Sequence, residues 1–144
     1  MKLPDYVSVK EVQRICAELN IRDWTLLKKA QVLPKEAKII LAELDTGEMN
    51  IKLKDFTLGL EVELEHGIRF QEANVTNNHP IITGKIVLAH FKESLEYYQR
   101  LEVAEIEGDI FKAVVNKNAT KVVALYEKLV KAKLELSQTE IEMV

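Results

Sequence analysis

Apolar side chains recur every three or four residues along most of the chain, the period of α-helices that bury one face. The pattern that begins at Pro80 has a candidate break near Ser94. We therefore predict an all-α fold, a compact domain of about five to seven helices. The main predicted helices are 9–19, 23–30, 34–44, 55–66, 80–107 and a last one that starts after Asn118.

Local capping signals mark several of these helix ends. Ser8 and Glu11 have the spacing of a capping box, and Asn118 is a candidate cap for the last helix. Gly67 is predicted to stop the helix 55–66 with a left-handed backbone, and Gly47 is predicted to end the helix 34–44. The connections between helices are then short, as few glycines and prolines also suggest.

The remaining segments carry weaker patterns. Residues 48–54 alternate apolar and polar side chains, but no partner strand is evident, so we interpret them as a connector. Residues 68–79 read as a polar loop, and residues 110–115 as a short separate segment. The acidic end, 137–144, is predicted to fray.

The composition fits one ordinary globular domain over residues 1–144. Apolar residues make up 47% of the chain and charged residues 30%, with no apolar run of the length that spans a bilayer. The first residues lack the pattern of a secretory signal, and Cys16 is the only cysteine. We predict a soluble, cytoplasmic protein without membrane partners.

The charge argues against nucleic acid as a partner. The formal net charge is −3, and lysines alternate with acidic residues along the chain. A DNA-binding module made of helices 9–19, 23–30 and 34–44 is an alternative, because a short turn separates the last two. Its lysines, however, are interleaved with acidic residues: Lys28, Lys29, Lys35 and Lys38 against Asp23, Glu36 and Glu43.

One cluster of ionisable residues carries a chemical hypothesis. The outer two of the three histidines each have a carboxylate three positions away, in Glu63-x-x-His66 and His90-x-x-Glu93, so each pair shares one helical face. Two facing helices of this kind would offer two imidazoles and two carboxylates, a ligand set suited to iron, manganese or zinc. We therefore take Glu63, His66, His90 and Glu93 as candidate metal ligands.

A simpler interpretation also accounts for these residues. His66 near a helix end interacts favourably with the helix dipole, and the glutamates around it form a solvated face. In a simple hairpin, moreover, His66 and His90 would be offset by roughly 15 Å at 1.5 Å per residue. His79 is interpreted as a loop residue that helps to start the following helix.

The segment Gly59–Gly67, with its Glu-Leu-Glu-His-Gly box, resembles an uncharacterised family of small prokaryotic and phage proteins. A downstream Ala-His-x-x-Glu-x-x-x-Tyr-Tyr box, from Ala89 to Tyr98, is similar to a second box of that family. By this resemblance residues 25–54 look like an insertion. His79 and Leu95 depart from the family pattern, which has an acidic residue and a proline at these places.

The resemblance implies a helical fold and picks out residues without naming a reaction. Around the candidate ligands we assign a supporting role to Glu61, Glu65, Tyr97 and Tyr98. The first hypothesis is thus a protein that binds a transition metal through its Glu/His cluster. The alternative is a non-enzymatic interaction or structural protein, a homo-oligomer that associates through the apolar part of its last helix, Val122–Val130. Neither fixes a substrate or shows whether the protein is an enzyme.

Overall fold

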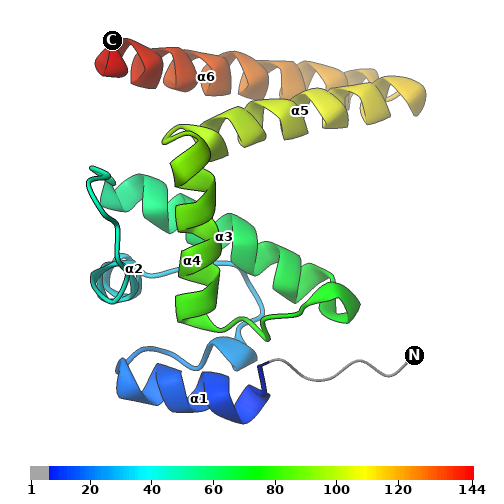
Figure 1. Cartoon of the computed structure of the whole chain (residues 1–144). Coiled ribbons are helices and arrows are strands. Elements are labelled where there is room, and N and C mark those ends of the chain that lie inside the picture. Colours follow the sequence, from blue (N-terminus) through cyan, green and yellow to red (C-terminus); the bar gives the residue numbers. More distant parts are fainter. Residues whose placement is uncertain (1–6) are drawn as a thin grey trace. The chain divides into compact units, whose positions relative to one another are not determined.

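The computed structural model describes residues 7–144, in which the regular secondary structure is helical and no residue belongs to a β-strand (Figure 1). The prediction of an all-α fold is confirmed, and residues 48–52 form turns and irregular backbone before the next helix begins. The α-helices are α1 (Val9–Glu18), α2 (Pro34–Ala42), α3 (Leu53–Arg69), α4 (Pro80–Glu93), α5 (Tyr97–Val115) and α6 (Ala119–Met143), and the short 3-10 helices are η1 (Trp24–Leu26) and η2 (Gln71–Ala73).

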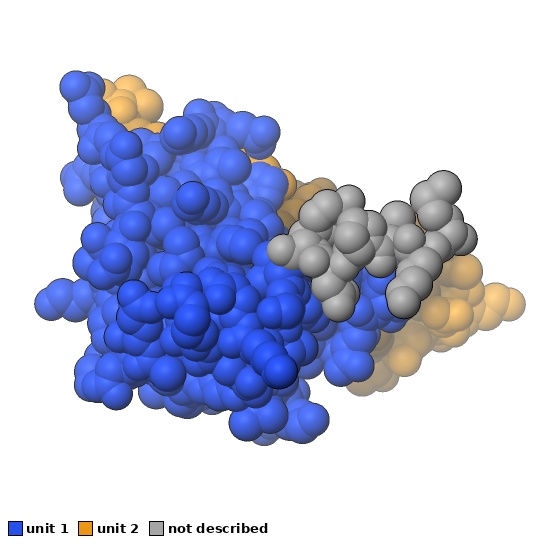
Figure 2. Space-filling view, turned by 60° about the horizontal axis from the view of Figure 1, so that its bottom comes forward, with its two compact units in different colours: residues 1–93 blue, residues 94–144 orange. Residues whose placement is uncertain are grey.

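The chain divides into two compact units, residues 1–93 and residues 94–144, which Figure 2 shows in different colours. The first unit contains α1 to α4 and both 3-10 helices, and the second contains α5 and α6. A single domain over the whole chain stays a prediction.

The core of the first unit lies where α2, α3 and α4 meet. Phe56 and Leu60 of α3 and Val87 of α4 are fully buried there. Gly84 lets α4 approach closely, because a Cβ atom at this position would lie 2.7 Å from Leu44 Cδ1 and 3.0 Å from Ile40 Cγ2. A larger residue would push these side chains apart, so the glycine sets the distance between α4 and the α2 region.

The N-terminal part of this unit begins with two capped helices. The Ser8 hydroxyl accepts a hydrogen bond from the Glu11 backbone at 3.2 Å, which confirms the predicted start of α1. Asp23 caps the next element as predicted, but this element is only the short η1 rather than a helix to residue 30. Trp24 and Cys16 are buried together in this region, and burial raises the pKa of the Cys16 thiol. This thiol is therefore a core group.

Two carboxylates accept hydrogen bonds from the non-helical segment between η1 and α2 and hold it in place. Glu36, which is buried, accepts hydrogen bonds from the Arg22 guanidinium at 2.6 and 2.8 Å and from the Leu33 backbone at 3.1 Å. Glu61 of α3 accepts one from the Val32 backbone at 3.0 Å. Because backbone groups that leave water need such partners, these two carboxylates fix the path of the segment against α3.

The second unit is a pair of antiparallel helices (Figure 1). Asn118 caps α6 as predicted, with its side chain accepting from the Lys121 backbone at 3.0 Å. The tight turn before it places Lys117 in the left-handed region, with φ at 53°. Leu125, Leu129 and Ala132 of α6 are buried. No helix within residues 7–144 combines the length and the apolar character needed to cross a bilayer.

Some predicted boundaries differ from the structure. The break near Ser94 is confirmed, since α4 ends at Glu93 and α5 begins at Tyr97. Residues 110–115, however, are not a separate segment: α5 continues through Gly108, whose missing side chain faces open space. A single glycine lowers helix stability by only about 1 kcal/mol, too little to interrupt a helix that packs along α6. Helix α6 continues to Met143, through the segment predicted to fray.

Candidate functional site

The crossing of α3 and α4 brings the four candidate ligands together. In Figure 1 α4 crosses α3 rather than running alongside it. Glu63 consequently lies between two imidazoles: its Oε1 is 3.5 Å from His90 Nε2, and its Oε2 is 3.9 Å from His66 Nδ1. The offset between His66 and His90 that a simple hairpin would cause does not keep the pairs apart. His90 lies next to Glu63, which is one helical turn before His66 on α3.

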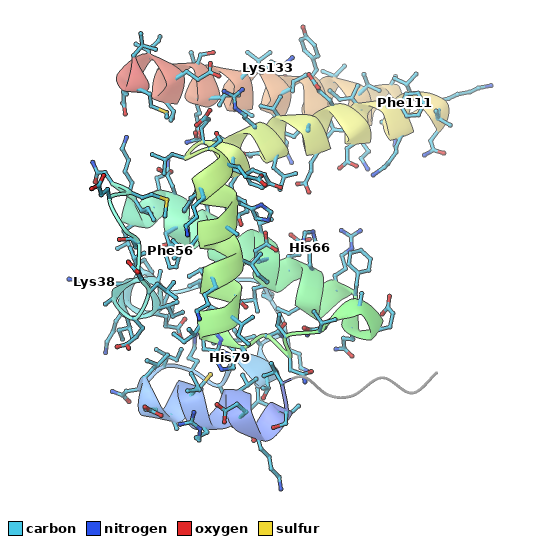
Figure 3. All side chains as sticks on the ribbon, in the orientation of Figure 1. Lys38, Phe56, His66, His79, Phe111 and Lys133 are labelled. Atoms are coloured by element: carbon cyan, nitrogen blue, oxygen red, sulfur yellow. The ribbon has the colours of Figure 1, made fainter. Side chains whose placement is uncertain are left out.

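The cluster has a shielded centre and an exposed edge. The Glu63 side chain is only 14% exposed, whereas Glu93 is 71% exposed. Glu93 lies on the far side of the His90 ring, with its Oε2 4.0 Å from Nδ1. His66, labelled in Figure 3, projects from α3 and is more than half exposed. The two carboxylates therefore face opposite nitrogens of His90, and only Glu63 is held close to both histidines.

These positions do not form a closed set of metal ligands as they stand. Within residues 7–144 no group of three or more His, Cys, Asp or Glu side chains is arranged to hold an ion. Ligand atoms about 2.0–2.2 Å from one ion lie roughly 3–3.5 Å from each other, a separation that the Glu63–His90 pair meets and the Glu63–His66 pair exceeds. A metal would require His66 to turn towards Glu63.

A pocket of about 320 Å³ opens next to Glu63 and His66. It lies between α3, the η2 region and the first half of α4, so the carboxylate and the imidazole stand at its edge. Its walls combine polar and apolar side chains, which suits a small ligand better than a purely apolar core cavity would. The other lining residues are Gly67, Phe70, Ala73, Asn74, Val75, Thr76, Thr83 and Ile86.

Gly67 shapes this pocket in a way that the sequence pattern did not indicate. The predicted helix stop at Gly67 is wrong, because α3 continues to Arg69 and the backbone of Gly67 is not left-handed. A Cβ atom there would lie 2.0 Å from Asn78 Oδ1. Asn74 Nδ2 also donates to the Gly67 carbonyl at 3.1 Å and to Asn78 Oδ1 at 3.0 Å. The glycine thus makes room for an asparagine pair against α3.

The loop before α4 holds these asparagines in an unusual backbone conformation. Asn77 and Asn78 have φ values of 48° and 62°, in the left-handed region that asparagine tolerates better than most residues. The Asn77 side chain donates to the Val7 carbonyl. Sequence reasoning missed this loop, together with Asn74 and Thr83, which line the pocket. The consecutive asparagines, which favour left-handed turns, are the signal that could have drawn attention to the loop.

Three contacts are clear for the residues assigned a supporting role. Glu61 is directed to the Val32 backbone, and Glu65 lies 3.7 Å from Arg69 on the exposed face of α3. Tyr97 and Tyr98 belong to the second unit, where their rings pack edge to face with centroids 5.2 Å apart. Their predicted role beside a metal stays a prediction.

His79 takes part in helix capping, as the sequence interpretation expected. It is buried at the N-terminal end of α4, near α1 (Figure 3), and its Nδ1 accepts a hydrogen bond from the Ile82 backbone at 3.3 Å. Burial lowers the pKa of His79 below its ordinary value of 6.5; among the nearby charges Arg14 lowers it further and Glu11 raises it. The fold thus favours the neutral imidazole, whose Nδ1 can accept the capping hydrogen bond.

This arrangement predicts a pH-dependent stability that His79→Asn removes. Because the unfolded chain binds a proton to His79 more readily than the folded chain, the stabilisation is complete above pH 6.5 and is lost as the pH falls below that value. Asparagine can still accept the capping hydrogen bond, so the variant should stay within about 1 kcal/mol of the wild type at pH 8. Urea unfolding at pH 8 and pH 5 checks this, and an equal acid loss in the variant would contradict it.

Comparison with known proteins identifies a family for this chain. A family model described as "Protein of unknown function (DUF5661)" covers residues 12–107, which run from α1 into α5 and include the whole Glu/His cluster and its pocket. No curated protein and no solved structure matches the chain. The match supports the expected resemblance to an uncharacterised family, while the particular sequence boxes and the phage or prokaryotic origin stay predictions.

Proposed function

Since the chain belongs to the DUF5661 family of proteins of unknown function, we propose its function from the site itself: it binds one divalent transition-metal ion on Glu63. In this proposal His66 and His90 are the other protein ligands. The single observation that supports it is the position of the Glu63 carboxylate between the two imidazoles, 3.9 and 3.5 Å away.

The chemistry of the ligands favours iron, manganese or zinc. Imidazole nitrogen and carboxylate oxygen both bind these ions at about 2.0–2.2 Å. His90 already lies at nearly the separation that two ligands of one ion require, and His66 is exposed enough to rotate without disturbing the core. The ion would then sit at the shielded centre of the cluster, next to Glu63.

Glu93 has a different role from the one that spacing alone assigns to it. It faces Nδ1 of His90, whereas Glu63 faces Nε2. A carboxylate on the second ring nitrogen of a ligand histidine fixes the orientation of the ring and makes the other nitrogen a better donor to the metal. In the proposed site Glu93 is therefore a positioning residue and not a ligand.

With three protein ligands, a bound ion would keep open coordination positions for a small ligand. The pocket of about 320 Å³ begins at Glu63 and His66, and Asn74, Thr76 and Thr83 supply polar groups along it. A metal with open positions binds water or the oxygen of a small ligand and polarises it. The proposal therefore includes a small oxygen-containing ligand that reaches the metal through this pocket.

The proposal is tested with full-length, tag-free protein. We expect about one ion per chain when metal content is measured by plasma mass spectrometry after incubation with Zn²⁺, Mn²⁺ or Fe²⁺. Glu63→Gln removes a ligand and should weaken binding, measured by calorimetry, by at least about 100-fold, whereas Glu93→Gln removes only the partner of a ligand and should weaken it about 10-fold. The matched control is Glu65→Gln. The proposal gives Glu65 no part in the site, because it faces Arg69 on the exposed face of α3, so removing its charge should leave binding unchanged.

Two results would overturn the proposal. The first is wild-type protein that stays free of all three metals. The second is an equal loss of affinity in the Glu63→Gln and Glu65→Gln variants, which would point to non-specific attraction by the charge of α3. Circular dichroism of each variant verifies that the helices are intact.

A further inference from the structure

Helix α6 has two apolar faces, and only one of them is buried. Leu125, Leu129 and Ala132 form the buried face. The second face, here called the outer stripe, has apolar residues whose exposed fractions lie between 54% and 75%. It consists of Val123, Tyr126, Val130, Leu134 and Ile141, which recur at three, four or seven positions as on one side of a helix.

The outer stripe contains no charged residue. Between Leu134 and Ile141 the helical spacing places only Ser137 on it. This is notable in a helix rich in charge, because both flanks between the outer stripe and the buried face carry lysines and glutamates. The charged residues, all of them off the stripe, are Lys121, Glu127, Lys128, Lys131, Lys133, Glu135, Glu140 and Glu142.

We propose that the outer stripe is the interface of a homodimer, in which α6 packs antiparallel against α6 of a second copy. The sequence prediction of self-association through Val122–Val130 is thereby refined, because Leu125 and Leu129 of that segment face inward and are not available. The proposal is independent of the metal site, which lies in the other unit.

The area of the stripe is adequate for a dimer. Its five apolar side chains expose roughly 500–600 Å² per copy, so that pairing would bury at most about 1,000–1,200 Å² in total, at the lower limit of stable interfaces. The unit itself also gains from a partner. A pair of helices with one buried seam is too thin to form a substantial core, and a second pair converts it into a four-helix bundle.

The charges beside the stripe favour the antiparallel arrangement. On one flank Lys133 and Glu140 already form ion pairs within the chain, with Glu107 at 2.8 Å and Arg100 at 2.6 Å. The other flank carries Glu127 and Lys131, separated by one helical turn.

In an antiparallel pair the same flank of each helix faces its counterpart. If the pair is centred near Leu129, Glu127 of each copy lies level with Lys131 of the other, giving two reciprocal ion pairs. In that register Tyr126 falls between Val130 and Leu134 of the second copy, so the apolar side chains also interdigitate. Charge and packing thus favour the same register.

The dimer is tested by sedimentation velocity on the full chain between 1 and 100 µM, about the range in which interfaces of this size associate. We expect the wild type to be a dimer at the upper end. Val130→Glu should weaken association at least about 100-fold, since it places two carboxylates at the centre of the interface. The matched control is Val115→Glu, an equally exposed valine on α5, which should leave the dimer intact.

A charge exchange tests the register. Lys131→Glu alone should weaken the dimer about 10-fold at low salt, and the double variant Glu127→Lys/Lys131→Glu should restore it, because the reciprocal pairs are then reversed. Wild-type protein that is monomeric at 100 µM would overturn the proposal. A dimer that Val115→Glu disrupts as strongly as Val130→Glu would place the interface elsewhere and overturn it too.

Discussion

Replacing Trp24 with alanine is expected to lower the free energy of unfolding by about 3–5 kcal/mol, the largest effect of any single substitution predicted for this chain. Trp24 is fully buried, in the short helix η1 that packs on α1. Its loss removes the largest side chain of the core and leaves a cavity that the one-turn helix cannot close. Guanidinium unfolding followed by circular dichroism measures the effect, because the variant has no tryptophan fluorescence.

Leu26→Ala is the matched control for this prediction. Leu26 lies in the same 3-10 helix but is exposed, so its truncation should change the free energy of unfolding by less than about 0.5 kcal/mol. Similar losses in the two variants would mean that the effect comes from the helical turn itself and not from burial of the indole.

Glu36→Ala is expected to lower the free energy of unfolding by about 2–4 kcal/mol at pH 7. The buried carboxylate accepts hydrogen bonds from the Arg22 guanidinium and from the backbone of Arg22 and Leu33, and alanine leaves these groups without their acceptor. Urea unfolding measures the loss. Glu18→Ala is the control, because Glu18 forms only an exposed ion pair with Arg14 and its removal should be nearly neutral.

The same carboxylate makes the fold sensitive to acid. Burial by itself would raise the pKa of Glu36, but the hydrogen bonds from Arg22 and Leu33 outweigh it and hold the pKa below the ordinary value of 4.5. The unfolded chain therefore binds this proton first, so the stabilisation is complete above pH 4.5 and is lost as the pH falls below it. The difference in stability between wild type and Glu36→Ala should shrink there. A constant difference down to pH 3 would contradict this explanation.

The parts of the fold that depend only on residues close together in the sequence could be predicted. Ser8, Asp23 and Asn118 cap the elements that follow them, because a short polar side chain can satisfy the first backbone amides without help from the rest of the chain. The error at Gly67 has the opposite origin. Glycine there serves a close approach by Asn78, eleven positions later, and no local pattern distinguishes this need from a helix stop.

In the candidate site, too, the local features could be predicted from the sequence and the contacts between helices could not. The spacing of Glu63 with His66, and of His90 with Glu93, correctly placed each pair on one helical face. Which carboxylate would lie between the imidazoles depends on the angle at which α3 and α4 cross, and crossing angles follow from packing and not from spacing. The apolar residues of α6 were likewise recognised, but their separation into a buried face and the outer stripe required the position of α5.

The backbone conformation and hydrogen bonds of Asn77 and Asn78 limit which amino acids this loop can tolerate at these two positions. The left-handed backbone there favours glycine, yet glycine has no amide to donate to Val7 or to accept from Asn74. Most other side chains offer polar groups but strain the backbone by about 1 kcal/mol or more at each position. Asparagine satisfies both demands at position 77, where the side chain must donate, whereas position 78 needs only an acceptor and can also take aspartate. Substitutions that the fold tolerates should therefore be confined to asparagine at 77 and to asparagine or aspartate at 78, even where the surrounding loop changes freely.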